Sequence, residues 1–204
     1  MKYKPNNSFV KGLNTSVQFV LLNVIYLLLC LPIVTIGVAT SALFEVTLKY
    51  ADHEKGYLLL GFFHALKENW KKATAAYLIL GVPLLLMSYS SVFWLSMGQS
   101  IITTIIGFLS LIFIGYLWIV LTYSLALIAR FDTSFKQTLK NAFLLPLAEP
   151  TRSLGLLLIP ITCLCLIILF PNFKLLLLLF GFSFMNYVSS FLLLAIFKKQ
   201  GAMG

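Results

Sequence analysis

A run of 57 residues with no charged or histidine side chain, from Ala73 to Ala129, constrains this chain most. Soluble domains keep about a quarter of their residues charged, whereas only 10% of the residues are charged in this chain of 204. Because about 20 apolar residues cross a bilayer as a helix, the run alone holds two membrane spans and a tight turn. The chain is therefore predicted to be an all-α integral membrane protein.

Hydropathy predicts a bundle of five full transmembrane helices and one shorter helix. The predicted spans are Val17–Val34, Ala73–Leu95, Ile101–Ile128, Leu154–Phe170 and Leu175–Phe197. The shorter helix, Ile36–Tyr50, is too short to cross alone and is predicted to return towards the side on which the first span began. Residues 1–200 are predicted to form one transmembrane helical domain, and residues 201–204 are interpreted as a non-native tail.

The distribution of Lys and Arg predicts the orientation. Lys49–Lys72 carries five Lys, and Arg130–Arg152 carries four Lys or Arg. By the positive-inside rule these connections and the C-terminal tail face the cytoplasm, and the short turns Ser96–Ser100 and Pro171–Lys174 face outside. Further cations lie near the N-terminus: Lys2, Lys4 and Lys11. Both termini can be cytoplasmic if Ile36–Tyr50 returns, and this is the arrangement we expect.

The reversal before this return helix is predicted at Pro32–Gly37. Pro32 ends the first helix, and Gly37 supplies the backbone freedom for a sharp turn. Thr35 and Thr40 can satisfy backbone groups that the break leaves free. The small residues that follow favour close packing on a neighbouring helix: Gly37, Ala39, Ser41 and Ala42.

Two cytoplasmic segments have the pattern of amphipathic helices, Gly56–Lys72 and Asp132–Pro146. The apolar face of the first is predicted to hold Leu59, Phe62, Phe63, Leu66 and Trp70. The polar faces carry His64, Lys67 and Glu68 in the first segment, and Lys136, Gln137 and Lys140 in the second. Two hypotheses stay open: the helices anchor the bundle on membrane lipid, or their polar faces dock a cytoplasmic partner.

Catalytic signatures are missing from the sequence. It contains no Walker motif, no H-E-x-x-H and no G-x-S-x-G. Three scattered cysteines favour neither a disulfide framework nor a zinc site. The net charge of +9 sits at the ends of apolar segments, unlike the solvated basic face of a nucleic-acid reader. We expect no enzyme, no cofactor, no metal and no nucleic-acid partner.

Few polar residues lie at membrane depth. Ion-coupled transporters usually place an ionisable group there, and Glu45 is the only acid nearby. We expect Glu45 to pair with Lys49 at i+4; the alternative is a buried acid that binds a partner or ligand. The amides are expected to join helices by hydrogen bonds, with a polar pathway or ligand site as the alternative: Gln18, Asn23 and Asn186.

One block of sequence resembles a known family. LPIVTIGVATSAL at residues 31–43 is followed by EKGY at 54–57 and FFHALKENW at 62–70. This order resembles the YesL-like family of bacterial membrane proteins, which is often encoded beside carbohydrate ABC importers. The resemblance implies an accessory subunit in the bacterial cytoplasmic membrane, with ABC permease or ATPase subunits as partners. A stand-alone small-molecule carrier or channel is the alternative function.

Overall fold

The computed structural model describes residues 8–54, 57–97, 100–170 and 172–200, which contain helices and no strand. The elements are α1 (Ser8–Leu29), the 3-10 turn η1 (Ile33–Thr35), α2 (Ile36–Ala51), α3 (Leu58–Met97), α4 (Ile101–Arg130), α5 (Phe135–Ala148), α6 (Pro150–Leu169), α7 (Phe173–Leu176), the π-helical η2 (Leu177–Gly181) and α8 (Phe182–Lys199). Five helices in these ranges are long and apolar enough to cross a membrane. The prediction of an all-α, multi-span membrane protein is confirmed. The tail 201–204, Lys2, Lys4 and Gly56 lie outside the described residues.

The first two helical segments differ from the prediction. Ile33–Ala51 is among the five candidate spans, whereas the apolar part of α1, Asn14–Leu29, is a shorter helix. The sequence had predicted the opposite assignment, with a span that continued to Val34. The helix ends earlier because Pro32 disfavours helical geometry at the residue before it, although hydropathy still counts Leu31–Val34 as membrane-compatible.

The chain reverses between α1 and α2. The rings of Phe19 and Tyr50 lie 5.6 Å apart, and the Tyr26 hydroxyl lies 3.1 Å from the Thr40 hydroxyl. These pairs place the two helices antiparallel, so the helix after the break does return. The start of α1 and the end of α2 therefore lie at the same end of the pair.

Helix α2 is the buried centre of the molecule. Twelve of its sixteen residues are buried, and it packs against α1, α3, α4 and α8. The crossing with α3 is so close that a Cβ atom on Gly37 would lie 2.3 Å from the Tyr77 Cβ. The prediction that Gly37 forms the turn is wrong, because Gly37 lies inside α2. A missing side chain there permits close helix packing.

Other small residues of α2 face different neighbours. The Ser41 hydroxyl donates to the Leu125 carbonyl of α4 over 3.1 Å. Ala39 packs in a cluster with residues of α1 and α3, among them Leu22 and Phe62. Small residues on several sides let α2 contact its neighbours closely, rather than forming the single packing face that the sequence predicted.

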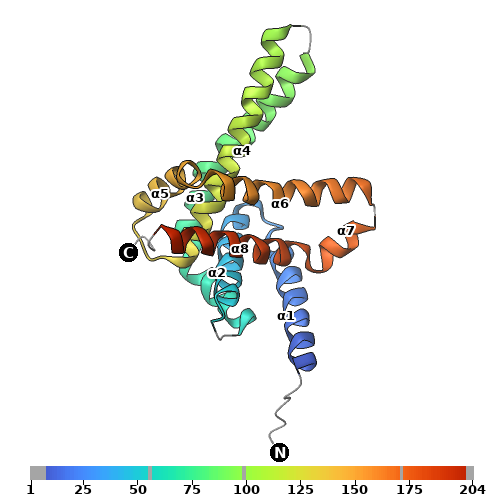
Figure 1. Ribbon diagram of the computed structural model, residues 1–204, viewed down its shortest axis with the longest axis vertical. Helices are drawn as coiled ribbons and strands as arrows, with labels where there is room; N and C mark the ends of the chain where they lie inside the picture. The colour runs from blue at the N-terminus through green and yellow to red at the C-terminus, as the bar shows by residue number, and fades with distance from the viewer. Residues whose placement is uncertain (1–7, 55–56, 98–99, 171, 201–204) are drawn as a thin grey trace, which may run out of the picture.

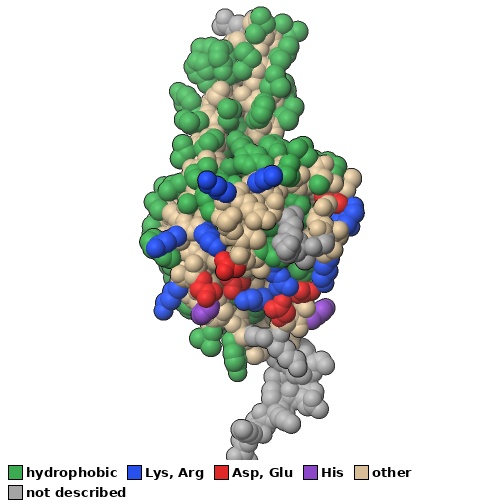
Figure 2. All heavy atoms as spheres, turned by 90° about the vertical axis from the view of Figure 1, so that its left-hand side faces the viewer, with side chains coloured by type: hydrophobic (Ala, Val, Ile, Leu, Met, Phe, Trp, Pro, Cys, Tyr) green, Lys and Arg blue, Asp and Glu red, His purple; other side chains and the backbone are tan. Residues whose placement is uncertain are grey.

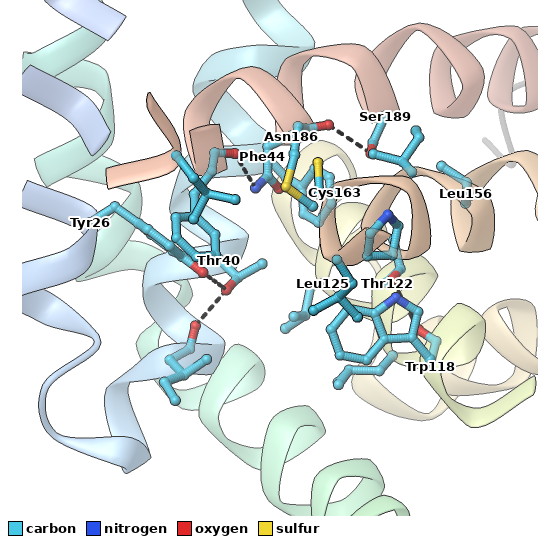
Figure 3. Close-up of a pocket in the computed structure, with 18 of the residues that line it drawn as sticks. Tyr26, Thr40, Phe44, Trp118, Thr122, Leu125, Leu156, Cys163, Asn186 and Ser189 are labelled. Carbon is cyan, nitrogen blue, oxygen red and sulfur yellow. Dashed lines mark hydrogen bonds between the residues drawn. The ribbon is translucent and has the colours of Figure 1, made fainter. Parts of the chain in front are cut away.

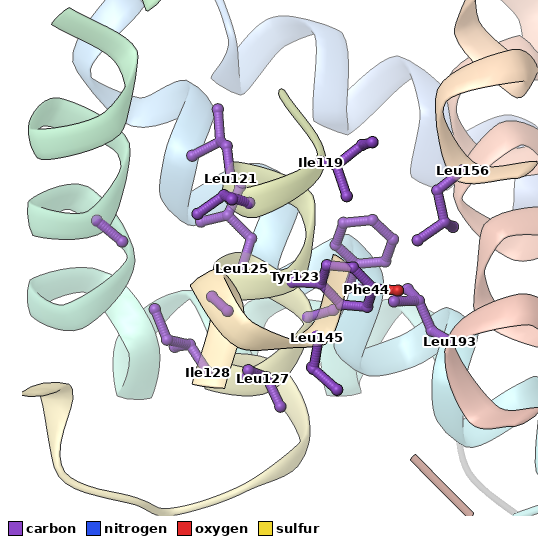
Figure 4. Packing of buried hydrophobic residues seen from close by; sticks show 14 of the residues in the cluster. Phe44, Ile119, Leu121, Tyr123, Leu125, Leu127, Ile128, Leu145, Leu156 and Leu193 are labelled. Atoms are coloured by element: carbon purple, nitrogen blue, oxygen red, sulfur yellow. The ribbon is translucent and has the colours of Figure 1, made fainter. Parts of the chain in front are cut away.

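The largest apolar cluster surrounds the second half of α4. Tyr123 is fully buried there, and side chains from α2, α5, α6 and α8 pack around it, as Figure 4 shows for Phe44, Leu145 and Leu193. The Tyr123 hydroxyl has a partner in the Ser153 hydroxyl of α6, 2.8 Å away. This cluster holds the ends of α4, α5 and α8 together.

The helices packed around α2 and this cluster form the body of the molecule. Two helical hairpins extend from the body in different directions (Figure 1). Helices α3 and α4 form one, and α6 with α7–α8 forms the other. The outer halves of both expose large apolar side chains, for example Leu85, Ile112 and Ile168. Figure 2 shows charged side chains gathered over the body, whereas the α3–α4 hairpin is covered by hydrophobic ones.

The first amphipathic segment predicted from the sequence is not a separate interfacial helix. Leu58–Met97 is one continuous helix of 40 residues that passes through Pro83. The second segment does form its own helix, α5, which continues past Pro146 to Ala148. Pro150 then opens α6 at its first turn, a position that tolerates proline.

Candidate functional site

All acidic side chains of the chain lie near one end of the body and form ion pairs. Asp52 binds Arg130 at 2.7 Å and Lys198 at 2.8 Å. Arg130 also binds Glu54 at 2.5 Å. The other pairs are Glu45–Lys49, Glu68–His64, Asp132–Lys72, Glu149–Arg152 and Glu149–Lys199. This network joins the ends of α2, α4 and α8 to the α5–α6 junction.

The network favours the ionised form of two carboxylates, because it lowers the pKa of Asp52 and of Glu149. A hydrogen bond from Lys198, reinforced by Arg130, holds the pKa of Asp52 below its usual range. A hydrogen bond from Lys199 lowers the pKa of Glu149 in the same way. Within the described ranges no group of three or more His, Cys, Asp or Glu side chains could hold a metal ion. The chemistry at this end is charge pairing between helix termini.

The polar faces predicted on the two cytoplasmic segments are on the surface. The side chains concerned are all exposed: His64, Lys67, Glu68, Lys136, Gln137 and Lys140. His64 and Glu68 lie 3.2 Å apart and pair with each other. Across the described part of the chain, the three lysines have no acidic partner. Each face therefore presents cationic charge that the ion-pair network does not neutralise.

The inner side of each segment explains why these faces point outwards. Leu58, Phe62 and Ala65 are buried and pack against α1 and α2. Phe63 and Trp70, which the sequence placed on the apolar face, are 47% and 55% exposed. The sequence assigned the buried face from the large apolar side chains and therefore placed it at the wrong angle around the helix. The close contact between α2 and α3 buries the small Ala65 instead.

Glu45 connects α2 to α3 at the charged end. Its Oε1 binds Lys49 Nζ at 2.7 Å, the i+4 pair expected from the sequence. Its Oε2 accepts a hydrogen bond of 3.0 Å from Asn69 Nδ2 on α3. Glu45 is buried, so both carboxylate oxygens are satisfied within the fold, and neither points to an open ligand site.

Asn23 stabilises a break in the last hairpin. Its Nδ2 donates to the Leu178 carbonyl over 2.7 Å, and its Oδ1 accepts from the Ser183 amide over 3.0 Å. Leu178 lies in η2 and Ser183 follows it, and the π-helical geometry of η2 disturbs the regular hydrogen-bond ladder. Asn23 thus joins α1 to α8. Gln18 is half-buried and makes no side-chain hydrogen bond to a described residue.

A cavity of about 360 Å³ lies between the two hairpins (Figure 3). Its walls come from α1, α2, α3, α4, α6, η2 and α8. Asn186 lies in the wall, whereas Gln18 and Asn23 do not. The structure therefore separates the amides that the sequence grouped into one polar path. Asn186 Nδ2 donates to the Phe182 carbonyl of its own helix over 3.0 Å.

Comparison with known proteins gives one result. The family model described as a protein of unknown function, DUF624, matches residues 19–91. No curated protein and no solved structure matches the chain. The matched segment runs from α1 through the break and α2 into the first hairpin. It therefore includes the buried centre of the fold and the first polar face.

Sequence reasoning did not place several groups in the cavity wall, including Thr40, which it had assigned only to the break before α2. Tyr26 and Thr40 meet across the α1–α2 reversal, and Trp118 and Thr122 line the opposite side on α4 (Figure 3). Cys163 of α6 also lines the cavity. Their only sequence signal is a hydroxyl, indole or thiol within an apolar span, and many lipid-facing residues share that signal.

Proposed function

We propose that this protein is a non-enzymatic accessory subunit of the bacterial cytoplasmic membrane that associates with a carbohydrate ABC importer. The link to an importer comes from the resemblance to the YesL-like family. One observation supports docking of a partner: the exposed Lys67 on the first face, and Lys136 and Lys140 on the second, have no acidic partner among the described residues. The charged end then faces the cytoplasm, together with both termini, as the positive-inside rule requires.

Both polar faces lie on helices that are packed firmly in the fold, and this supports a protein partner. The first face belongs to a 40-residue helix that continues into the apolar hairpin, so it cannot rotate freely into a lipid surface. The second face lies on α5, which packs on α4 through buried Ala142 and Leu145. A pre-organised surface loses less conformational entropy on binding. Complementary acidic groups on a permease or ATPase subunit would then select the partner.

Copurification from the native host tests this function. In one variant His64, Lys67 and Glu68 become Ser; in a second, Lys136, Gln137 and Lys140 become Ser. We expect unchanged expression and membrane insertion but lower recovery of permease and ATPase subunits, because interface side chains typically contribute from a few tenths to several kcal/mol each.

A matched control comes from the opposite end of the molecule. Lys174 of α7 is an exposed lysine far along the second hairpin from the charged end, and Lys174→Ser should leave copurification intact. Full recovery of the partners by both triple variants would reject docking through these faces. Intact copurification, together with less anionic lipid retained by the detergent-purified variants than by wild type, would instead assign the faces to anionic lipid.

The cavity favours a second candidate, a stand-alone small-molecule carrier. It is of a size typical of ligand sites, and it contains Asn186. Against this candidate, no acidic or basic side chain in the described ranges lines the cavity, whereas ion-coupled carriers need a titrating or ion-binding group. Uptake of labelled sugar by proteoliposomes that contain this chain alone would favour the carrier over the accessory subunit.

A further inference from the structure

The cavity between the hairpins has the chemistry of a site for an uncharged, mostly apolar ligand. Leucine, isoleucine and aromatic side chains make up most of its wall, and among the described residues no Lys, Arg, His, Asp or Glu lines it. A charged headgroup inside would lose its hydration without a counter-charge, at a cost of several kcal/mol or more. The wall therefore excludes ionic ligands.

The mouth of the cavity is bordered by residues of two candidate membrane spans. Trp118 of α4 and Leu164 of α6 both line the cavity, and they are also 41% and 59% exposed. Each lies well inside a helix that is long and apolar enough to span the bilayer. In a bilayer that these helices cross, the medium next to the mouth is hydrocarbon, and the molecules that enter from it are lipids.

Two polar groups of the wall, on Asn186 and Trp118, keep unused hydrogen-bonding capacity. The hydroxyls of Thr122 and Ser189, in contrast, already donate to carbonyls of their own helices over 2.9 and 2.8 Å. Asn186 uses its Nδ2 in the same way, but its Oδ1 accepts no hydrogen bond from a described residue. The indole N–H of Trp118 likewise has no partner among the described residues. The cavity thus offers one free acceptor and one free donor.

We propose that this cavity binds a neutral lipid that carries a free hydroxyl, with diacylglycerol as the matching chemical class. The hydroxyl donates to Asn186 Oδ1, an ester carbonyl accepts from the indole of Trp118, and one hydrocarbon chain fills the apolar wall. The second chain remains in the bilayer at the mouth. This site is independent of the cytoplasmic docking faces and does not require an importer partner.

Photo-crosslinking of the purified full chain tests the site. The probe is a diacylglycerol with a diazirine in one acyl chain, in mild detergent, with crosslinks mapped by mass spectrometry. Cys163→Trp places a bulky ring in the cavity wall. Cys165→Trp, two residues along the same helix, adds the same ring at an exposed position outside the wall. We expect a several-fold loss of crosslinking in the first variant and wild-type crosslinking in the second.

Labelling of the native thiols Cys163 and Cys165 gives a second measurement, which does not depend on whether the tryptophan variants fold. Diacylglycerol should slow maleimide labelling of Cys163 several-fold and leave labelling of the exposed Cys165 unchanged. Phosphatidic acid of the same chain length, which adds charge, should protect Cys163 poorly. Asn186→Leu should reduce the preference for diacylglycerol over its acetylated, hydroxyl-free analogue.

Three outcomes would overturn the proposal. Equal crosslinking of wild type and Cys163→Trp would show that the lipid binds elsewhere. Crosslinks spread along the outer surfaces of α3 and α4 would indicate annular lipid only. Equal protection by diacylglycerol and phosphatidic acid would remove the selection against charge on which the proposal depends.

Discussion

Replacing Gly37 by alanine should destabilise the fold, although the change adds one methyl group. A Cβ at position 37 would lie 2.3 Å from the Tyr77 Cβ and 2.9 Å from the Ala73 carbonyl oxygen, where real Cβ contacts under 3.0 Å are essentially never seen. Both neighbouring atoms are fixed to the backbone of α3. No change of rotamer can relieve the contact, so α2 and α3 must move apart.

The size of the effect follows from two opposing terms. Overpacking a tight core costs about 1–3 kcal/mol, and a contact fixed by backbone belongs at the upper end, about 3 kcal/mol. Alanine is better than glycine within a helix by about 1 kcal/mol. The net loss is about 2 kcal/mol, which for a protein of this size corresponds to a fall in Tm of about 4–8 °C.

The assay is thermal unfolding of the purified protein in mild detergent, followed by size-exclusion fluorescence. Gly81→Ala is the control, because a Cβ there would lie 3.8 Å from the Tyr77 ring, an ordinary contact. Its Tm should match wild type or rise slightly. Gly37→Leu should lower the Tm more than Gly37→Ala. A wild-type Tm for Gly37→Ala would refute the close α2–α3 crossing.

A double-mutant cycle separates this contact from a general effect of the substitution. Tyr77→Gly removes the atom nearest to the new methyl group, although it also removes a large side chain and is destabilising by itself. We expect the double variant to be more stable than the sum of the single effects predicts, because the 2.3 Å contact with the Tyr77 Cβ is absent in it, while the 2.9 Å contact with the Ala73 carbonyl oxygen remains. Strict additivity would mean that Gly37 acts through something other than Tyr77.

Three further predictions follow from the polar contacts and the topology. Asn23→Leu should lower the Tm, because burying the unpaired backbone groups around η2 costs roughly 1–3 kcal/mol; an unchanged Tm would assign those groups another partner. The lowered pKa of Asp52 contributes stability that is present above its ordinary pKa of about 4 and is lost as the pH falls through the folded value. The Tm of wild type should therefore fall more steeply below about pH 5 than that of Lys198→Gln, and parallel pH profiles would contradict this pairing. In a cysteine-free background, impermeant maleimide added outside should label Asn172→Cys but not Gln200→Cys, and the reverse pattern would invert the proposed orientation.

Sequence alone predicted the class of the fold and most of the helices. The apolar runs predict Ile101–Ile128 where the structure has Ile101–Arg130, because a span of that length requires a helix in lipid. The same reasoning failed at Gly56–Lys72. Hydropathy falls in this segment because it carries lysines, and the sequence therefore predicted a separate helix there. Backbone hydrogen bonding does not depend on side-chain polarity, so the segment and the following span form one helix, α3.

The sequence predicted the first polar face but not the ion-pair network, and the reason is physical. Local i+3 and i+4 spacing places His64, Lys67 and Glu68 on one surface, so a single segment contains enough information to find that face. Asp52 and Lys198, which form an ion pair, are 146 residues apart in the sequence, and no local sequence pattern predicts their contact. Pairing of this kind depends on where the hairpins end in space.

The burial of α2 and the cavity beside it show the limit of hydropathy in a membrane protein. A leucine that faces lipid and one that faces another helix have equally apolar surroundings, so composition does not distinguish them. Gly37 and Ser41 do distinguish α2, because small residues are needed where backbones approach closely. Trp118 of α4 and Leu164 of α6, in contrast, line the cavity, and their composition is the same as that of lipid-facing side chains. The small residues could therefore be found from the sequence, whereas the cavity could not.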